Sequence, residues 1–386
     1  MIGRVRTIAL VSVLLAGPAI GQAQVYTSAL QNYRVDTVAS GLVNPWSMAF
    51  LPGGDMLVTE RPGRLRIVRG GKLLAEPVAG VPQVVALGQG GLFDVVLHPN
   101  FASNRLIYLS FSKPTGDSAA ATTAVVRGKW ENDRLTGVEE VFVAVSRGAT
   151  GHYGARLAFD RSGYLFITVG DRMVPSTGDL AAHPAQDLSN HHGKTIRLHD
   201  DGRVPTDNPF VGKEGARPEI WSFGHRNSQA IAVHPETGDV WETELGPQGG
   251  DELNLIRPGL NYGWPVIGFG VNYRTGAAIH SGTLRDGMEP PVHVWVPSIG
   301  VSGMMIYTGD KFPAWKGSVF AGGLAGEQLV RLTLDGRRAE MADILLRRQG
   351  RVRDVRQGPD GFIYVAIDNR QGTPTPIVRL KPVTRR

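Results

Sequence analysis

Short apolar strands recur in pairs along the chain, and each pair is joined by a turn that carries Pro, Asp or Gly. In the clearest example, the strand Trp46–Phe50 is followed by Pro52, Gly53 and Gly54 and then by a second strand at 56–59. Glycine and aspartate supply the backbone conformations that a tight connection between strands requires. Six such pairs begin near residues 46, 92, 155, 230, 303 and 352.

Each pair has the pattern of the inner hairpin of a propeller blade. Six repeats predict an all-β fold, a six-bladed β-propeller whose four-stranded blades protect their edges by packing around a central channel. The stretch 327–334 alternates in polarity and is therefore also expected to be a strand. The pairs are unevenly spaced, so the extra residues are expected in loops, which build the site on one face of a propeller.

The N-terminal residues have the pattern of a secretory signal peptide. A start with two arginines precedes an apolar run from Ile8 to Leu15, and a stretch of small residues ends at Ala23. The apolar run is too short to span a bilayer, and Gly17-Pro18 disfavours a buried helix. We therefore expect residues 1–23 to be removed and the mature chain, 24–386, to be a single periplasmic or secreted domain.

The composition narrows the possible chemistry. The chain has 386 residues and no cysteine, which excludes disulfides and thiol catalysis. Its 42% apolar residues are enough for a large core. The formal net charge is +6 and the basic residues are scattered, so no nucleic-acid partner is expected, whereas a small anionic ligand is compatible with the sequence.

A histidine and an aspartate stand at the two ends of the third hairpin. His152 lies in Gly151-His152-Tyr153-Gly154, and Asp171 follows the second strand of the same hairpin. An imidazole with an ordinary pKa of about 6.5 suits a general base, and a carboxylate on the same rim could orient it. The alternative is that His152 has a structural role.

Five further polar residues lie in loops or at strand mouths. Arg226 and Asn227 are adjacent in a polar loop, Gln89 lies among glycines, and Arg351 and Arg353 share one face of a strand. Paired guanidinium groups suit a multiply charged anion. Solvated loops and outward-facing arginines are the alternatives.

The glycine-rich loop 245–252 offers possible ligands for calcium. It contains Gly246 and Pro247, ends with two acidic residues, and is followed by Asn-Tyr-Gly-Trp-Pro at 261–265. Calcium prefers oxygen ligands, including backbone carbonyls. The spacing differs from that of an EF-hand, so a simple cluster of turns is the alternative.

In this order the segments resemble the soluble aldose sugar dehydrogenase family, relatives of the soluble quinoprotein glucose dehydrogenases. The resemblance covers nearly all of the mature chain, from 42 to 369. Its most specific motifs are Gly-His-Arg-Asn at 224–227, Gly-Pro-x-Gly-Gly-Asp-Glu at 246–252 and the segment 261–265. It implies oxidation of an aldose at C1 to the lactone, by hydride transfer to pyrroloquinoline quinone (PQQ) in the presence of Ca²⁺.

The resemblance also implies roles for individual residues. His152 would be the general base, Asp171 would orient it, and Arg226 would stabilise negative charge on the reacting quinone oxygen. The residues implied to contact the quinone are Gln89, Arg226, Asn227, Tyr273, Ser298, Arg351 and Arg353. The carbonyls of Gly246 and Pro247 would bind the catalytic calcium, and Glu252 with the carbonyl of Tyr262 would bind a second, structural calcium.

Two positions depart from the family pattern. Ala325 stands where relatives tend to have a lysine that contacts the quinone, and Leu245 stands where they are often polar. Arg331 and Lys311 are the nearby cations expected to compensate for the missing lysine.

Two other functions compete with the dehydrogenase: a calcium-dependent hydrolase of the lactonase type, and a non-catalytic binding propeller. The sequence is compatible with a monomer or a homodimer, and with a soluble or a membrane electron acceptor.

Overall fold

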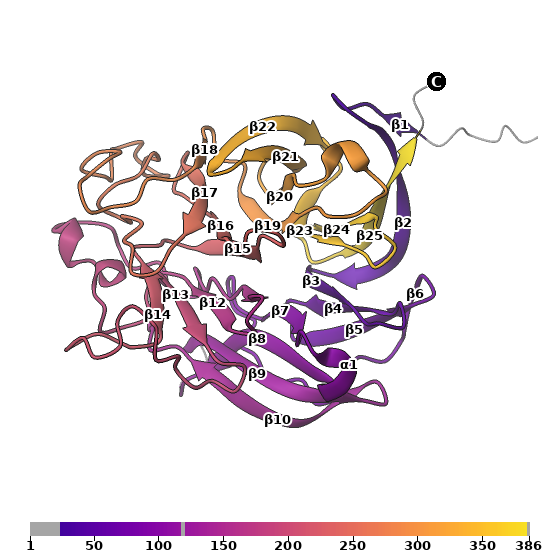
Figure 1. Ribbon diagram of the computed structural model, residues 1–386, viewed down its shortest axis with the longest axis horizontal. Coiled ribbons are helices and arrows are strands. Elements are labelled where there is room, and N and C mark those ends of the chain that lie inside the picture. The colour runs from indigo at the N-terminus through magenta and orange to yellow at the C-terminus, as the bar shows by residue number, and fades with distance from the viewer. Residues whose placement is uncertain (1–23, 117–119, 384–386) are drawn as a thin grey trace, which may run out of the picture.

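Six antiparallel sheets surround a central axis in the computed structural model, which describes residues 24–116 and 120–383 (Figure 1). The predicted six-bladed propeller is confirmed, and all six predicted hairpins form the first two strands of a blade. The predicted strand at 327–334 is also present, as β21 (Gln328–Asp335). The proposed signal peptide, residues 1–23, lies outside the described residues.

The first five blades each contain four strands that are consecutive in the sequence. Their strands are β3 (Pro45–Phe50), β4 (Met56–Glu60), β5 (Arg64–Arg69) and β6 (Lys72–Leu73); β7 (Leu92–Leu97), β8 (Leu106–Pro114), β9 (Ala121–Glu131) and β10 (Arg134–Val143); β11 (Leu157–Phe159), β12 (Leu165–Val169), β13 (Lys194–Leu198) and β14 (Ile220–Phe223); β15 (Ser228–Val233), β16 (Val240–Glu244), β17 (Asp251–Ile256) and β18 (His293–Trp295); and β19 (Val301–Ile306), β20 (Val319–Gly323), β21 and β22 (Arg338–Leu345).

The sixth blade joins the two ends of the described chain. It contains β23 (Arg351–Gln357), β24 (Ile363–Asp368) and β25 (Pro374–Val383), and its outer strands are β2 (Asn32–Val43) and β1 (Val25–Tyr26). The long β2 pairs with β25 from Asn32↔Val383 to Val43↔Pro374. Since these strands lie at opposite ends of the sequence, their pairing closes the ring.

Hydrophobic clusters fill the space between neighbouring blades. Leu57 and Leu65 of the first blade pack with Leu92 and Ile107 of the second, and equivalent clusters occupy the other five interfaces. A fully buried aliphatic or aromatic side chain contributes about 1.5–3 kcal/mol, so these six clusters are the main source of stability in a chain without disulfides.

A charged network occupies the axis. Arg156, directly before β11, forms an ion pair with Asp354 of β23 at 2.9 Å, and Arg356 bonds to both Asp354 and Asp94 at 2.9 and 3.0 Å. The same two aspartates accept backbone N–H groups from neighbouring blades, as Asp94 does from Leu157 at 2.9 Å. Because the acids are fully paired, the network ties the inner strands together at the centre of the ring.

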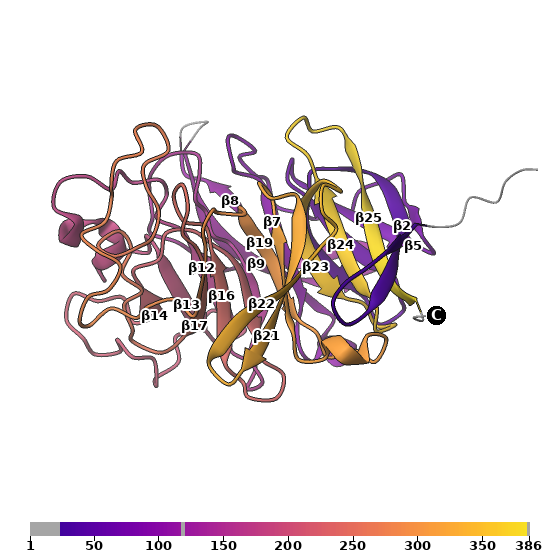
Figure 2. The same cartoon turned by 90° about the horizontal axis from the view of Figure 1, so that it is seen from above.

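Long connections carry the remaining residues. Seen edge-on in Figure 2, the strands cross the thickness of the ring and the loops lie on its two faces. The longest loops join β12 to β13 and β17 to β18, in the intervals where extra residues were expected. The one α-helix in the described chain is the single turn α1 (Phe101–Asn104), and 3₁₀ turns occur at Leu180–Ala182, Pro184–Gln186 and Pro313–Trp315. Within the described residues no helix has the length and apolar character needed to cross a bilayer.

Candidate active site

The site residues come from equivalent positions in different blades. The first two strands of a blade are antiparallel, so the start of one lies beside the end of the other, as in Pro45↔Glu60 and Arg351↔Asp368. The segments at these strand ends surround the axis on one face. They contain Arg61 after β4, Asp171 after β12 and Leu245 after β16.

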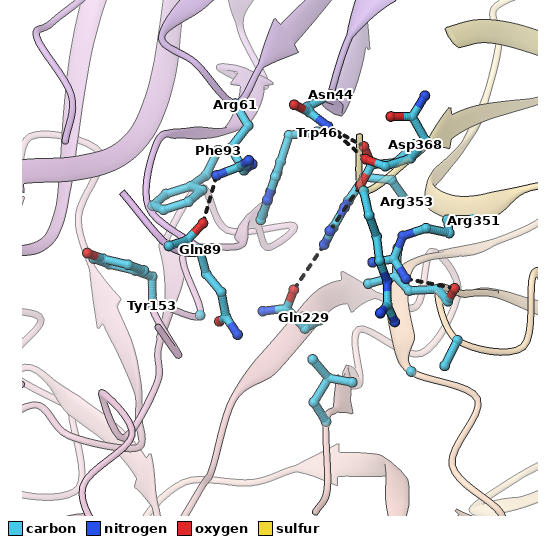
Figure 3. Close-up of a pocket in the computed structure, with 18 residues that line it drawn as sticks. Asn44, Trp46, Arg61, Gln89, Phe93, Tyr153, Gln229, Arg351, Arg353 and Asp368 are labelled. Atoms are coloured by element: carbon cyan, nitrogen blue, oxygen red, sulfur yellow. Dashed lines mark hydrogen bonds and ion pairs between the residues drawn. The ribbon is translucent and has the colours of Figure 1, made fainter. Parts of the chain in front are cut away.

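A cavity of about 370 Å³ opens on this face. Phe93 and Tyr153 lie on one side with Arg61 and Gln89, and Arg351 and Arg353 lie on the opposite side with Asp368 (Figure 3). Arg370 is the fourth arginine of the lining. Of the predicted cofactor ligands, Gln89, Arg351 and Arg353 line this cavity. Its other principal lining residues are Asn44, Trp46, Arg61, Phe93, Tyr153, Gln229, Ala325, Asp368 and Arg370.

The cavity is strongly electropositive. Asp368 is the one acidic residue among the described residues that line it, and it bonds to Arg353 at 3.3 Å and to Asn44 at 2.9 Å. Burial and the nearby charge of Arg353 lower the pKa of Arg61, and the same two causes lower the pKa of Arg351. Like charges held together in this way favour binding of an anion with several negative groups.

His152 and Asp171 form a buried pair beside this cavity. The His152 Nδ1 atom lies 2.6 Å from Asp171 Oδ1, and the second carboxylate oxygen accepts the indole N–H of Trp264 at 2.8 Å. His152 has a φ of 48°, in the left-handed region, and its backbone N–H donates to Gln89 Oε1 at 2.9 Å. The predicted pair is therefore present, and the imidazole orientation is fixed by the carboxylate.

Electrostatics favour a neutral imidazole and an ionised carboxylate. Burial and the positive charge of Arg226 lower the pKa of His152, although Asp171 partly offsets them. Burial alone would raise the pKa of Asp171, but His152 and Arg226 outweigh it and hold that pKa below its ordinary value. With Nδ1 bonded to the carboxylate, Nε2 is available as a base, because no described residue bonds to it.

Arg226 connects the His152–Asp171 pair to the glycine-rich loop. Its Nη1 donates to the carbonyls of Leu245 and Gly246, both at 2.8 Å, and its guanidinium lies 5.2 Å from the ring centre of Trp264. Its own carbonyl accepts the N–H of Asp171 at 2.8 Å. The neighbouring Asn227 accepts N–H groups from Gly154 and Gln229 at 3.1 and 3.2 Å, so it holds the His152 loop against the fourth blade.

The carbonyls predicted to bind the catalytic calcium face side chains of the site. The Gly246 oxygen accepts Tyr273 Oη at 3.1 Å in addition to Arg226, and the Pro247 oxygen accepts Ser298 Oγ at 3.3 Å. Two adjacent carbonyls that accept only side-chain donors are a set of hard oxygen ligands, and such a set fits calcium. Tyr273 and Ser298 thus lie at this loop, and neither lines the main cavity.

Two carboxylates stand side by side next to the same loop. Glu244 ends β16 and is the cross-strand partner of Glu252, and both line a small second cavity with Arg226 and Tyr262. Burial raises the pKa of each acid to about 8, and the charge of Glu244 adds to the effect on Glu252. The described residues contain no cluster of three or more His, Asp or Glu side chains suited to a metal, so a cation at this place also needs backbone carbonyls.

The prediction that Arg331 or Lys311 compensates for the missing lysine is wrong. Ala325 lines the cavity, but Arg331 is buried in an ion pair with Asp343 at 2.6 Å and Lys311 lies beside the exposed Asp310. Neither cation is among the residues that line the cavity.

Sequence reasoning missed Arg61 and Arg370, which supply the additional positive charge, and also Trp264 and Glu244. Arg61 follows the second strand of its hairpin as Asp171 does, and Arg370 comes shortly after β24. Both arginines could have been predicted from their position just after the second strand of a hairpin. Trp264 and Glu244 lie in or beside motifs that were noted, but their contacts depend on how the loops fold.

The fold and site together define a class: a six-bladed propeller with an arginine-lined cavity near its axis and a buried histidine–aspartate pair beside it. The family model described as Glucose / Sorbosone dehydrogenase matches residues 42–379. The chain therefore belongs to the glucose/sorbosone dehydrogenase family, and it is an oxidoreductase.

Named relatives agree with this assignment. The chain is 44% identical to aldose sugar dehydrogenase YliI of Escherichia coli over 345 residues, which cover 88% of this chain and 91% of the relative. It is 26% identical to quinoprotein glucose dehydrogenase B of Acinetobacter calcoaceticus, over 88% of this chain and 86% of that protein. The PQQ-bound structure of an aldose sugar dehydrogenase from Streptomyces coelicolor is similar, with a TM-score of 0.72 and 29% identity over 91% and 98% of the two chains.

Proposed function

We propose that this protein oxidises aldose sugars at C1 to the lactone, with PQQ and calcium as cofactors and His152 as general base. The observation that carries the proposal is a buried His152–Asp171 pair at 2.6 Å beside a cavity with four arginines and one acid. The S. coelicolor relative binds PQQ, and the A. calcoaceticus relative is a quinoprotein.

The cavity suits PQQ in size and charge. Its volume of about 370 Å³ lies in the usual range of small-molecule sites, about 300–1,000 Å³. PQQ carries three carboxylates, and guanidinium groups bind carboxylates through charge-assisted hydrogen bonds. We assign Arg61, Arg351, Arg353 and Arg370 to these carboxylates, with Gln89 at the edge nearest to His152. Asn227 does not line the cavity, and its side chain holds the lining residue Gly154.

His152 would take the proton of the anomeric hydroxyl. The lowered pKa keeps its imidazole neutral at pH 7, and the free Nε2 is the atom that accepts the proton. Asp171 then stabilises the imidazolium through Nδ1, while Trp264 holds the other carboxylate oxygen and so fixes its direction. Once the proton is lost, the C1 hydrogen can leave as hydride and the sugar becomes the lactone.

Arg226 and the glycine-rich loop would form the electrophilic side of the site. When bound, PQQ would accept the hydride, and calcium held by the carbonyls of Gly246 and Pro247 would polarise the accepting quinone carbonyl. Arg226 contacts the Gly246 carbonyl at 2.8 Å, so negative charge that develops next to this carbonyl lies within its reach. Glu252, with Glu244 beside it and the carbonyl of Tyr262, would bind a second calcium.

The two competing functions have less support. A lactonase-type hydrolase needs carboxylates that converge on a calcium, but Asp94 and Asp354 at the axis are paired with Arg156 and Arg356. A non-catalytic binding propeller does not require a buried base that is oriented by a carboxylate and an indole N–H.

The test is reconstitution. Purified protein is stripped with EDTA, supplied with PQQ and calcium, and assayed by dye reduction with a panel of aldoses. We expect activity only when both cofactors are present, and magnesium in place of calcium serves as the control. The proposal is wrong if reconstituted protein neither binds PQQ nor reduces the dye with any aldose.

A further inference from the structure

Arg172 is a buried arginine that follows Asp171 and lines neither cavity. Only 1% of its surface is exposed, and its side-chain hydrogen bonds within the described chain all go to backbone carbonyls. A buried guanidinium without a carboxylate partner is costly unless its N–H groups are well satisfied. Its position therefore requires a specific explanation.

The guanidinium holds the loop that carries His152. Its Nη1 donates to the Gly151 carbonyl at 2.5 Å, and its Nη2 donates to the Ala149 and Ala121 carbonyls at 2.8 and 3.1 Å. The central guanidinium carbon, Cζ, lies 3.5 Å from the ring centre of Tyr153. The side chain thus contacts the residues on both sides of His152.

The Arg172 backbone holds the same loop. Its N–H donates to the His152 carbonyl at 3.3 Å, and its carbonyl accepts the N–H of Ala149 at 3.1 Å. The packing is close, since a Cβ on Gly148 would lie 2.6 Å from the Arg172 carbonyl oxygen. The loop that carries His152 and the segment that carries Asp171 and Arg172 are therefore held in direct contact.

The His152 loop needs such support because its backbone is strained. His152 and Arg172 both have positive φ values, 48° and 60°, which cost free energy in residues other than glycine and persist only when the surroundings enforce them. The backbone N–H groups of His152 and Gly154 donate to the side-chain oxygens of Gln89 and Asn227, which hold the edges of the loop, and Arg172 holds its centre.

We propose that Arg172 is a positioning residue for His152, which sets the place and the protonation of the imidazole without touching substrate or cofactor. The proposal rests on the role of His152 as general base. Arginine suits this task because its planar fork bonds two carbonyls while its face stacks on Tyr153, and lysine cannot do both. The charged groups that face His152 are Asp171, Arg226 and Arg172.

Arg172→Met and Arg172→Lys test the proposal in the reconstituted enzyme. We expect kcat to fall at least tenfold in both variants, while the sugar KM and the Kd for PQQ stay within threefold of wild type. In the His152→Ala background, Arg172→Met should cause less than a twofold further loss, because the group that it positions is absent.

Arg197→Met is the matched control. Arg197 is also buried, at 6% exposure, and stacks on a tyrosine, with its guanidinium 3.9 Å from the ring centre of Tyr164, but it lines neither cavity. This variant should lower the thermal midpoint and leave kcat within twofold. Equal losses of kcat in Arg197→Met and Arg172→Met, or an unchanged kcat in Arg172→Met, would overturn the proposal.

A readout that needs no activity separates this proposal from the proposed function. In cofactor-free protein with ¹⁵N-labelled histidine, NMR titration follows the His152 imidazole, which is assigned by His152→Ala. Arg172→Met should shift its resonances and raise its pKa, because a nearby positive charge is removed; Arg197→Met should do neither. A wild type without dehydrogenase activity would sink the proposed function, whereas unchanged His152 resonances would sink the role of Arg172. If Arg172→Met fails to fold, the changed contacts of Arg172→Lys are judged by the same resonances.

Discussion

Arg61→Gln is the sharpest test of the proposed cofactor site, because Arg61 was absent from every sequence expectation. A hydrogen bond to a charged group contributes about 1.5–3 kcal/mol. At about 1.4 kcal/mol per tenfold, its loss should raise the Kd for PQQ by about 10-fold to 150-fold. Without ligand, the lost bonds to the Gly88 and Gly90 carbonyls, at 2.9 and 3.2 Å, are opposed by relief of the repulsion from Arg353, so we expect little change in the thermal midpoint.

The assay is an equilibrium titration with PQQ, followed by quenching of tryptophan fluorescence, since Trp46 lines the cavity. Arg69→Gln is the control, because Arg69 is an exposed arginine that pairs with Asp55 and Asp133 at 2.7 and 2.9 Å. Added salt should weaken binding more in wild type than in Arg61→Gln, which has one cation fewer. A Kd within twofold of wild type would refute the assignment of Arg61 to a cofactor carboxylate.

Three further predictions concern the base and the carboxylates. His152→Ala should abolish dye reduction while PQQ still binds in the equilibrium titration; loss of both would mean that its role is misassigned. Since burial and Arg226 lower the pKa of His152, the acid limb of the kcat/KM profile should have its midpoint below the ordinary histidine value of about 6.5, and a midpoint above this value would contradict the assigned electrostatics. Burial raises the pKa of Glu244 and Glu252 to about 8, so the folded protein binds more protons than the unfolded chain between about pH 4.5 and pH 8. The thermal midpoint of EDTA-treated protein should therefore fall as pH rises through this range. A fall of the same size in Glu252→Gln would exclude Glu252 as its source.

The inner hairpins of all six blades could be predicted because their signal is local. A strand such as Leu92–Leu97 and the turn after it lie within a few residues of each other, and strand pattern and turn chemistry agree. The pairing of β2 with β25 has no such signal, since its first partners, Asn32 and Val383, are separated by almost the whole described chain. Closure of the ring was implied by the count of blades, but the strand that closes it was not.

The candidate site divides in the same way. His152, Asp171 and Arg353 could be found because each stands at the mouth of a recognisable hairpin. Arg61 has the same placement but carries no motif of its own. The prediction for Arg331 failed because its closeness to Ala325 in the sequence does not show which way its side chain points. The Arg331 guanidinium bonds to Asp343 instead of facing the cavity. Arg172 could not be found at all, because its role consists of bonds to carbonyls of a loop whose path the sequence does not reveal.

Ring closure and the arginine-lined cavity are physically linked. Asn44 directly follows the closing strand β2, with a positive φ of 47°, and its amide donates to Asp368 Oδ1 and to the Asn369 carbonyl, both at 2.9 Å. Asp368 in turn holds Arg353. The strand that completes the ring therefore ends on the carboxylate that orients a cavity arginine. Because the other cavity arginines extend from the first and sixth blades, which β2 joins, the spacing between these arginines depends on the closure of the ring.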